Sequence, residues 1–191
     1  MDATVNRAVF LDRDGTLVAD GRYAHDPEKM VLLGGVCAGL RLLETAGYQL
    51  IVVTNQSGIA LDYFTEPELH RMHERLAQLL AEEGVRIGAF YYCPHHPRGA
   101  VAEYAFDCTC RKPAPGMLLK AAEEHQIDLP RSWLIGDILD DVEAGNQAGC
   151  RSILLNVGTE TLPTVPSRTP AYVARDFLAA VRFILASDDL L

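Results

Sequence analysis

Two aspartates, Asp12 and Asp14, stand directly after a short apolar run near the N-terminus. Because side chains two positions apart in an extended segment point the same way, the two carboxylates can act on one substrate. One can attack a phosphorus atom and form an aspartyl phosphate, while the other protonates the leaving oxygen and later activates water. Clustered carboxylates repel each other, and a hard cation such as Mg²⁺ relieves this repulsion, with Asp137 as a third oxygen ligand. The spacing therefore indicates phosphoryl transfer, although an isolated Asp-x-Asp-Gly is also typical of an ordinary acidic turn.

Two further segments carry groups suited to binding phosphate. The first, Thr54-Asn55-Gln56-Ser57-Gly58, follows another apolar run, and its hydroxyl and backbone N–H groups can cradle phosphate oxygens. The second is the adjacent pair Arg111 and Lys112, which supplies counter-charge in a chain with a formal net charge of −9. Taken singly, these segments are also consistent with a plain turn and a solvated basic pair.

Four soft metal ligands lie in the segment 93–110, namely Cys93, His95, Cys108 and Cys110. A Cys₃His set suits a closed tetrahedral Zn²⁺ site, which is structural because no coordination position is left for water. The odd count of five cysteines argues against a disulfide framework. Unrelated reduced cysteines are the alternative reading, and we expect Cys37 and Cys150 to be small core residues.

Apolar runs that could form buried strands alternate with segments of helical periodicity along the chain. The predicted strands are Ala8–Leu11, Leu50–Val53, Ile87–Tyr92, Trp133–Ile135 and Ser152–Leu155. The predicted helices lie before Gly47, from the Thr65 capping box to Gly84, and at Met117–His125, Asp140–Ala148 and Ala174–Ala186. The alternation predicts a doubly wound α/β domain with a parallel sheet. In such sheets ligands bind beyond the carboxyl ends of the strands, where Asp12, Thr54 and Asp137 are expected.

The length of 191 residues predicts one domain, 1–191, and the 49% hydrophobic content is enough for a full core. The excess of 26 acidic over 17 basic residues disfavours nucleic acid and anionic membranes as partners and favours a small molecule. The N-terminal region lacks the apolar core of a signal peptide, and no run approaches the roughly 20 apolar residues of a membrane span. We therefore expect a cytoplasmic protein, and its oligomeric state stays open.

Four segments together resemble the four motifs of the haloacid dehalogenase superfamily, in the same order and at the same strand ends. They are 10–16, 54–58, 111–113 and 136–141. Two others, 92–97 and 108–117, resemble the heptose 1,7-bisphosphate phosphatase family within that superfamily. The resemblance extends from about Ala8 to Gly149 and implies a Rossmann-like fold without a large cap domain.

The resemblance also implies roles for individual residues. Asp12 would be the nucleophile and Asp14 the general acid and base of a Mg²⁺-dependent phosphatase that removes the 7-phosphate of D-glycero-D-manno-heptose 1,7-bisphosphate. The implied binding groups are Thr54, Asn55, Gln56, Ser57, Arg111 and Lys112 for the sugar phosphate, Asp12, Asp14, Asp137 and Asp141 for Mg²⁺, and Cys93, His95, Cys108 and Cys110 for Zn²⁺. Because Asp140 precedes Asp141, the second acidic residue of the fourth motif is ambiguous. The anomer and the pathway, lipopolysaccharide or another glycoconjugate, stay open.

One departure affects substrate choice. The heptose phosphatases usually continue the second motif with Arg-Gly, where this chain has Leu61-Asp62. Histidinol-phosphate phosphatase is the nearest alternative, but its relatives typically have Asp at the position of Ser57, followed by Gly-Leu-Gly. A zinc-loop module without catalysis is a further alternative, against which the acidic charge and the set of three aspartates argue.

Overall fold

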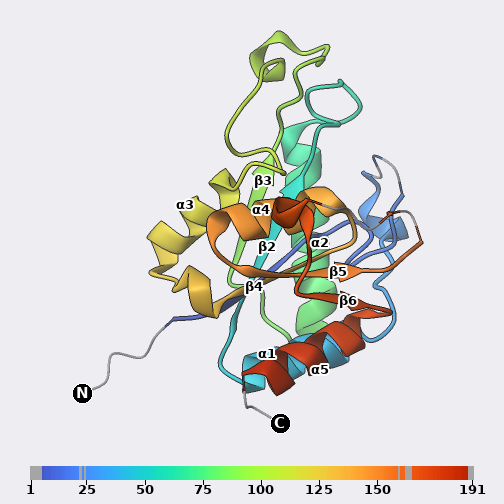
Figure 1. Cartoon of the computed structure of the whole chain (residues 1–191). Coiled ribbons are helices and arrows are strands. Elements are labelled where there is room, and N and C mark those ends of the chain that lie inside the picture. The colour runs from blue at the N-terminus through green and yellow to red at the C-terminus, as the bar shows by residue number, and fades with distance from the viewer. Residues whose placement is uncertain (1–5, 22, 24, 159, 162–164, 189–191) are drawn as a thin grey trace.

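A computed structural model describes residues 6–21, 23, 25–158, 160–161 and 165–188. Over these residues a six-stranded, entirely parallel sheet has the order β3-β2-β1-β4-β5-β6 (Figure 1). The strands are β1 Ala8–Leu11, β2 Gln49–Asn55, β3 Ala89–Cys93, β4 Trp133–Gly136, β5 Arg151–Leu155 and β6 Tyr172–Ala174. The helices are α1 Val36–Thr45, α2 Glu66–Glu82, α3 Gly116–His125, α4 Leu139–Ala148 and α5 Phe177–Ser187. The predicted doubly wound α/β class is confirmed, and no large cap domain occurs in the described part of the chain.

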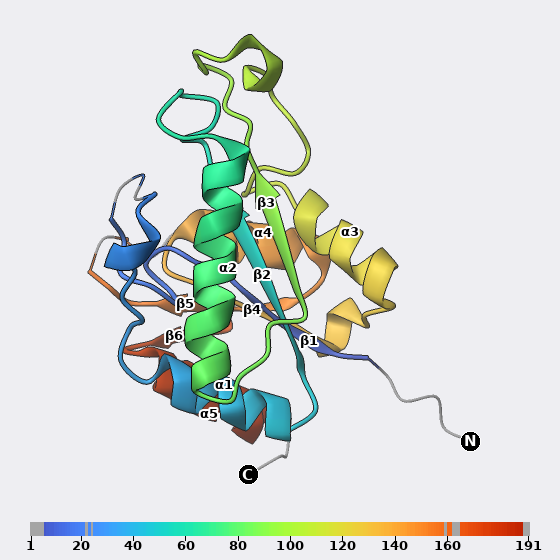
Figure 2. The ribbon, with the colours of Figure 1, turned by 180° about the vertical axis from the view of Figure 1, so that it is seen from behind.

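Helices cover both faces of the sheet because the strands are apolar on both sides. Val9 and Leu11 of β1 pack with α1, α2 and α5 on one face. Ala8 and Phe10 alternate with them and pack with α3 and α4 on the other. Figure 2 shows α2 crossing the first face, with α1 and α5 side by side near one end of the sheet.

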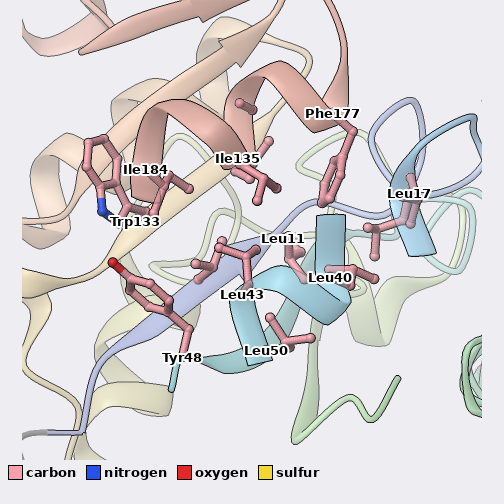
Figure 3. Close-up of a cluster of buried hydrophobic side chains, with 14 of the residues drawn as sticks. Leu11, Leu17, Leu40, Leu43, Tyr48, Leu50, Trp133, Ile135, Phe177 and Ile184 are labelled. Atoms are coloured by element: carbon pink, nitrogen blue, oxygen red, sulfur yellow. The ribbon is translucent and has the colours of Figure 1, made fainter. Parts of the chain in front are cut away.

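The larger core cluster lies between the sheet and α1, α2 and α5, and Figure 3 shows part of it. Trp133 and Phe177 are almost fully buried there, and burying a side chain of this size contributes roughly 1.5–3 kcal/mol. Leu11 and Ile135 are neighbours in register, and the last residue of β1 is thus fixed against β4. This packing holds the residues that follow both strands at a constant separation.

The predicted elements agree with the structure except at three places. The strand predicted at Ile87–Tyr92 begins two residues later in the structure, because β3 starts at Ala89. Thr54 lies inside β2 and not after it. The helix predicted from Ala174 is wrong at its start, because Tyr172–Ala174 pairs with β5 as a sixth strand and α5 begins at Phe177. A side-chain cap on the amide of Ala179 comes from Asp176, which could have indicated the true start. None of the described helices is long and apolar enough to cross a membrane.

Candidate active site

The predicted phosphate-handling groups meet at the carboxyl ends of β2, β1 and β4, three neighbouring strands of the sheet. Asp12 follows β1, and its backbone N–H donates to the carbonyl of Ile135 in β4 at 3.0 Å. Thr54 lies near the end of β2, and Asp137 follows β4. The chain runs from β1 outward to β2 and β3 and then crosses back to β4 on the other side of β1, so the strand order reverses here and the three side chains border the crevice expected at such a switch point.

A buried lysine lies between two aspartates at the centre of this crevice. Lys112 Nζ is 2.6 Å from Asp12 Oδ1 and 2.6 Å from Asp141 Oδ1, and it donates to the carbonyl of Val53 at 2.9 Å. Burial opposes the charge of Lys112, but the two carboxylates outweigh it and raise the pKa of the lysine. The lysine is therefore a fixed cation beside Asp12.

The carboxylates outnumber this cation. Ligand oxygens of Asp12, Asp137 and Asp141 all lie within 4.8 Å of one another. Burial is the main cause that raises the pKa of Asp12, and the charges of Asp141 and Asp137 add to it against the opposing effect of Lys112. Burial, followed by the charge of Asp141, also raises the pKa of Asp137 to about 7. A cluster of hard oxygen donors with excess negative charge fits a divalent cation such as Mg²⁺.

Two glycines allow the chain to approach these carboxylates closely. Gly15 has a φ of +80°, and a Cβ there would lie 2.2 Å from Asp137 Oδ2. A Cβ on Gly136 would lie 2.2 Å from Asp141 Oδ2. A side chain at either position would displace a carboxylate of the cluster, which gives both glycines a steric role in the site.

Asp14 is held apart from the buried cluster by side chains of its own loop and of the β2 end. Arg13 Nη2 donates to Asp14 Oδ2 at 2.8 Å, and Arg13 Nε donates to Oδ1 at 3.1 Å. Gln56 Nε2 donates to Asp14 Oδ2 at 2.9 Å.

His73 of α2 lies close to Arg13. Arg13 is almost fully buried. Burial of His73 itself, followed by the charge of Arg13, lowers the pKa of His73 to about 3. His73 is therefore neutral at physiological pH.

The neighbouring Asn55 fixes the backbone of Lys112. Asn55 Nδ2 donates to the Lys112 carbonyl at 3.0 Å, and the Lys112 N–H donates to Asn55 Oδ1 at 3.0 Å. Thr54 Oγ1 accepts from Gln56 Nε2 at 2.8 Å. The side chains of the 54–56 segment thus position the lysine and the second aspartate as well as bordering the crevice.

Two adjoining hollows open over these residues. The smaller, of 170 Å³, is lined by Asp12, Asp14, Asp20, Thr54, Asn55, Lys112, Asp137 and Ile138. The larger, of 450 Å³, is lined by Arg13, Asp14, Asp20, Tyr23, Asn55, Gln56, Ser57, Gly58, Arg111, Ile138 and Asp140. Because they share Asp14, Asp20, Asn55 and Ile138, they form one cleft with a narrow end at Asp12 and a wider end at Arg111.

The four predicted zinc ligands come together beside the wider end of the cleft. Cys93 Sγ is 3.5 Å from Cys108 Sγ, Cys110 Sγ is 3.2 Å from Cys108 Sγ, and His95 Nδ1 is 3.3 Å from Cys110 Sγ. Hydrogen bonding from Cys93 lowers the pKa of Cys110 to about 5, although burial opposes this. The cysteines are free thiols, and ligand atoms about 3.2–3.6 Å apart suit tetrahedral Zn²⁺ with bonds near 2.3 Å.

The loop 93–110, which carries the four predicted zinc ligands, is tied to the cleft at both of its ends. At the first, the Cys93 carbonyl accepts from the backbone N–H of Gln56 at 2.8 Å. At the second, Cys110 is followed by Arg111, whose Nη1 donates to the carbonyl of His95 at 3.4 Å. In Figure 1 this loop extends beyond β3 beside the loop that follows β2, and Val101 N–H donates to the Ala60 carbonyl between them.

Each predicted site residue has a definite place in this arrangement. The structure brings Asp141, not Asp140, into the buried cluster, whereas Asp140 pairs with Arg168 at the rim. The charge pattern Asp-Arg-Asp could have indicated that Arg13 compensates Asp14, a role that sequence reasoning missed. Tyr23 was also missed, and a lone tyrosine in a loop carries no signal in the sequence.

This fold and carboxylate site define a hydrolase of the HAD-like class, and a HAD-hydrolase-like family model matches residues 109–180. The chain is 41% identical over 180 residues to the D-glycero-beta-D-manno-heptose-1,7-bisphosphate 7-phosphatase of Yersinia pestis, covering 94% of this chain and 90% of that one. It is 43% identical over 155 residues to the enzyme of the same name from Escherichia coli K12, covering 81% and 78%. The D,D-heptose 1,7-bisphosphate phosphatase of B. bronchiseptica, complexed with magnesium and phosphate, superposes with a TM-score of 0.79 at 30% identity, covering 95% and 99%. The chain belongs to the heptose-1,7-bisphosphate 7-phosphatase family and is a phosphatase.

Proposed function

We propose that this phosphatase removes the 7-phosphate of D-glycero-β-D-manno-heptose 1,7-bisphosphate through an aspartyl phosphate on Asp12. The observation that carries the proposal is the narrow end of the cleft, where Asp12, Asp14 and Lys112 border one hollow of 170 Å³. The substrate rests on the names of the relatives and on Arg111 at the wider end, where a second phosphate would lie.

In the first step Asp12 attacks phosphorus, and the bond from phosphorus to the sugar oxygen breaks. Asp14 gives its proton to that oxygen, which therefore leaves as a neutral hydroxyl of the heptose 1-phosphate. Lys112 and the Thr54 hydroxyl face the transferring phosphoryl group and compensate its negative charge. The products of this step are the free sugar hydroxyl and a phosphorylated Asp12.

In the second step Asp14, now ionised, takes a proton from water, and the water oxygen attacks phosphorus. The bond to Asp12 breaks, inorganic phosphate leaves, and both carboxylates return to their starting states. Asp12, Asp137 and Asp141, with the Asp14 carbonyl, are the groups suited to hold Mg²⁺, which when bound supplies positive charge against the phosphoryl oxygens and the carboxylates. Cys93, His95, Cys108 and Cys110 would hold a structural Zn²⁺ that fixes the place of Arg111.

Two experiments test this proposal. Phosphate release is measured for heptose 1,7-bisphosphate, other sugar bisphosphates and histidinol phosphate, with and without Mg²⁺, and heptose 1,7-bisphosphate should have the highest kcat/KM. Asp12→Asn should retain less than about a tenth of wild-type activity because an amide cannot form the covalent intermediate. Glu74→Gln, the same change on the exposed side of α2, is the control and should be fully active. Preference for histidinol phosphate would reject the substrate, and an active Asp12→Asn would reject the mechanism.

A further inference from the structure

Gln56 lines the wider hollow, yet every hydrogen it can donate is already used. A glutamine has one backbone N–H and two hydrogens on Nε2. The backbone N–H donates to the Cys93 carbonyl at 2.8 Å. The two Nε2 hydrogens go to Asp14 Oδ2 at 2.9 Å and Thr54 Oγ1 at 2.8 Å. The remaining polar atom, Oε1, is an acceptor, and a phosphate dianion does not bind acceptors.

The orientation of this amide follows from its neighbours. If Nε2 and Oε1 were exchanged, an oxygen lone pair would face the Asp14 carboxylate, which would repel it. Gln56 is only 4% exposed, and burial strengthens the preference for the donating orientation. The backbone of Gln56 is fixed by its hydrogen bond to Cys93 and by its position directly after β2, so the side chain extends from a fixed Cα.

The two acceptors of this amide are both groups of the proposed mechanism. The Asp14 carboxylate is directed by Gln56 from the β2 side and by Arg13 from its own loop. The Thr54 hydroxyl accepts from Gln56, and a lone pair occupied in this way leaves the hydroxyl hydrogen to donate to a phosphoryl oxygen. A single buried amide therefore sets the direction of a proton-transferring carboxylate and of a hydroxyl donor.

We propose that Gln56 is a positioning residue that aims Asp14 at the leaving oxygen and makes Thr54 a donor, and that it does not bind the phosphate itself. This replaces the phosphate-binding role expected for Gln56 from the motif, and it rests on the proposed function of Asp14. Asn55, its neighbour, has a different role, because its side chain hydrogen-bonds the backbone of Lys112 and not the side chain of Asp14.

The test uses two substrates that differ in their need for a proton. p-Nitrophenolate leaves without protonation, whereas phenolate is a poorer leaving group that gains from a general acid. Asp14→Asn removes the general acid. The loss of kcat/KM that it causes for phenyl phosphate, divided by the loss for p-nitrophenyl phosphate, is the largest difference that any change at this acid can produce. General acid catalysis is typically worth about 10²–10⁴-fold, and we expect Gln56→Ala to lower kcat/KM for phenyl phosphate about tenfold more than for p-nitrophenyl phosphate. The loss common to both substrates reports the Thr54 hydroxyl.

Asn55→Ala is the matched control, because it removes two hydrogen bonds at the adjacent position but disturbs Lys112, which acts on the transferring group. It should lower kcat/KM for both substrates by the same factor. Gln56→Met keeps nearly the same length and volume without a donor and should show the same selective loss as Gln56→Ala, which covers the case in which the alanine variant does not fold. Equal losses on the two substrates in a folded Gln56 variant would overturn the action of Gln56 on Asp14, and no loss on either substrate would overturn the positioning role as a whole. If Asp14→Asn itself shows no difference between the substrates, the proposed mechanism fails instead.

Discussion

Replacing Lys112 by Met should destabilise the protein strongly, although the two side chains have similar volumes. Lys112 Nζ lies 2.6 Å from an oxygen of Asp12 and 2.6 Å from an oxygen of Asp141, and the lysine is 2% exposed. Breaking a buried ion pair by removing one partner typically costs about 3–5 kcal/mol, because the remaining charge is left uncompensated. With a urea m-value of about 3 kcal/mol/M, the unfolding midpoint should fall by roughly 1–2 M.

The same substitution at Lys120 is the control. Lys120 is exposed on α3, and its ammonium is 3.9 Å from Glu124, a surface pair worth about 0–1 kcal/mol. Urea unfolding of both variants is followed by circular dichroism in magnesium-free buffer without a chelator, so that the zinc loop is undisturbed. If Lys112→Met unfolds at the same urea concentration as Lys120→Met, the reasoning on the buried cluster is wrong.

The destabilisation should also depend on pH with a definite sign. Burial raises the pKa of Asp12 above the value of 3.8 that applies in the unfolded chain, and Lys112 opposes this rise. Without the lysine the carboxyl should take up a proton more readily. A folded-state pKa that is raised makes the folded state bind more protons than the unfolded state, so stability is lost as the pH rises through it. We expect the difference between Lys112→Met and wild type to be smaller at pH 5 than at pH 8.

Three further predictions concern the metals and the substrate. Protein purified without chelators should contain one Zn²⁺ per chain, and Cys110→Ser should lose it; metal analysis that finds no zinc in the wild type would reject the site. The affinity for Mg²⁺, measured by calorimetric titration, should fall by up to about tenfold per pH unit below about 7. The pKa of Asp137 is raised to about 7, so this carboxyl is protonated at lower pH and is then a poor metal ligand. Equal affinities at pH 6 and pH 8 would contradict this. Changing Leu61 to Arg and Asp62 to Gly should raise kcat/KM for the heptose bisphosphate more than for a heptose monophosphate, by up to roughly ten- to a hundredfold, if this segment reads the second phosphate. Asp62 has a φ of 62°, which favours glycine, so the double variant should fold normally, and an equal response of both substrates would exclude these positions.

The sequence alone determined the class of fold and the place of the candidate site, because both depend on local patterns. Short apolar runs that alternate with helical segments predict a parallel sheet, and the carboxyl ends of parallel strands meet at one edge. The proximity of Asp12, Thr54 and Asp137 could therefore be predicted from the sequence. The four candidate zinc ligands could also be predicted from the sequence, because two close pairs of soft ligands need only a closed loop between them to meet.

Only the tertiary structure decided which side chains act on which partners. Gln56 meets Asp14 across 42 positions of the chain, and Asn55 meets Lys112 across 57. Periodicity predicts the face on which a residue lies, but hydrogen bonds need donor and acceptor within about 3 Å, a distance set by the packing of whole elements. The same reason explains the choice of Asp141 over Asp140, which differ by one step around the start of α4 and therefore point in different directions. It also explains β6, whose three residues are too few to show a strand pattern in the sequence and form a strand because they pair with the edge of β5.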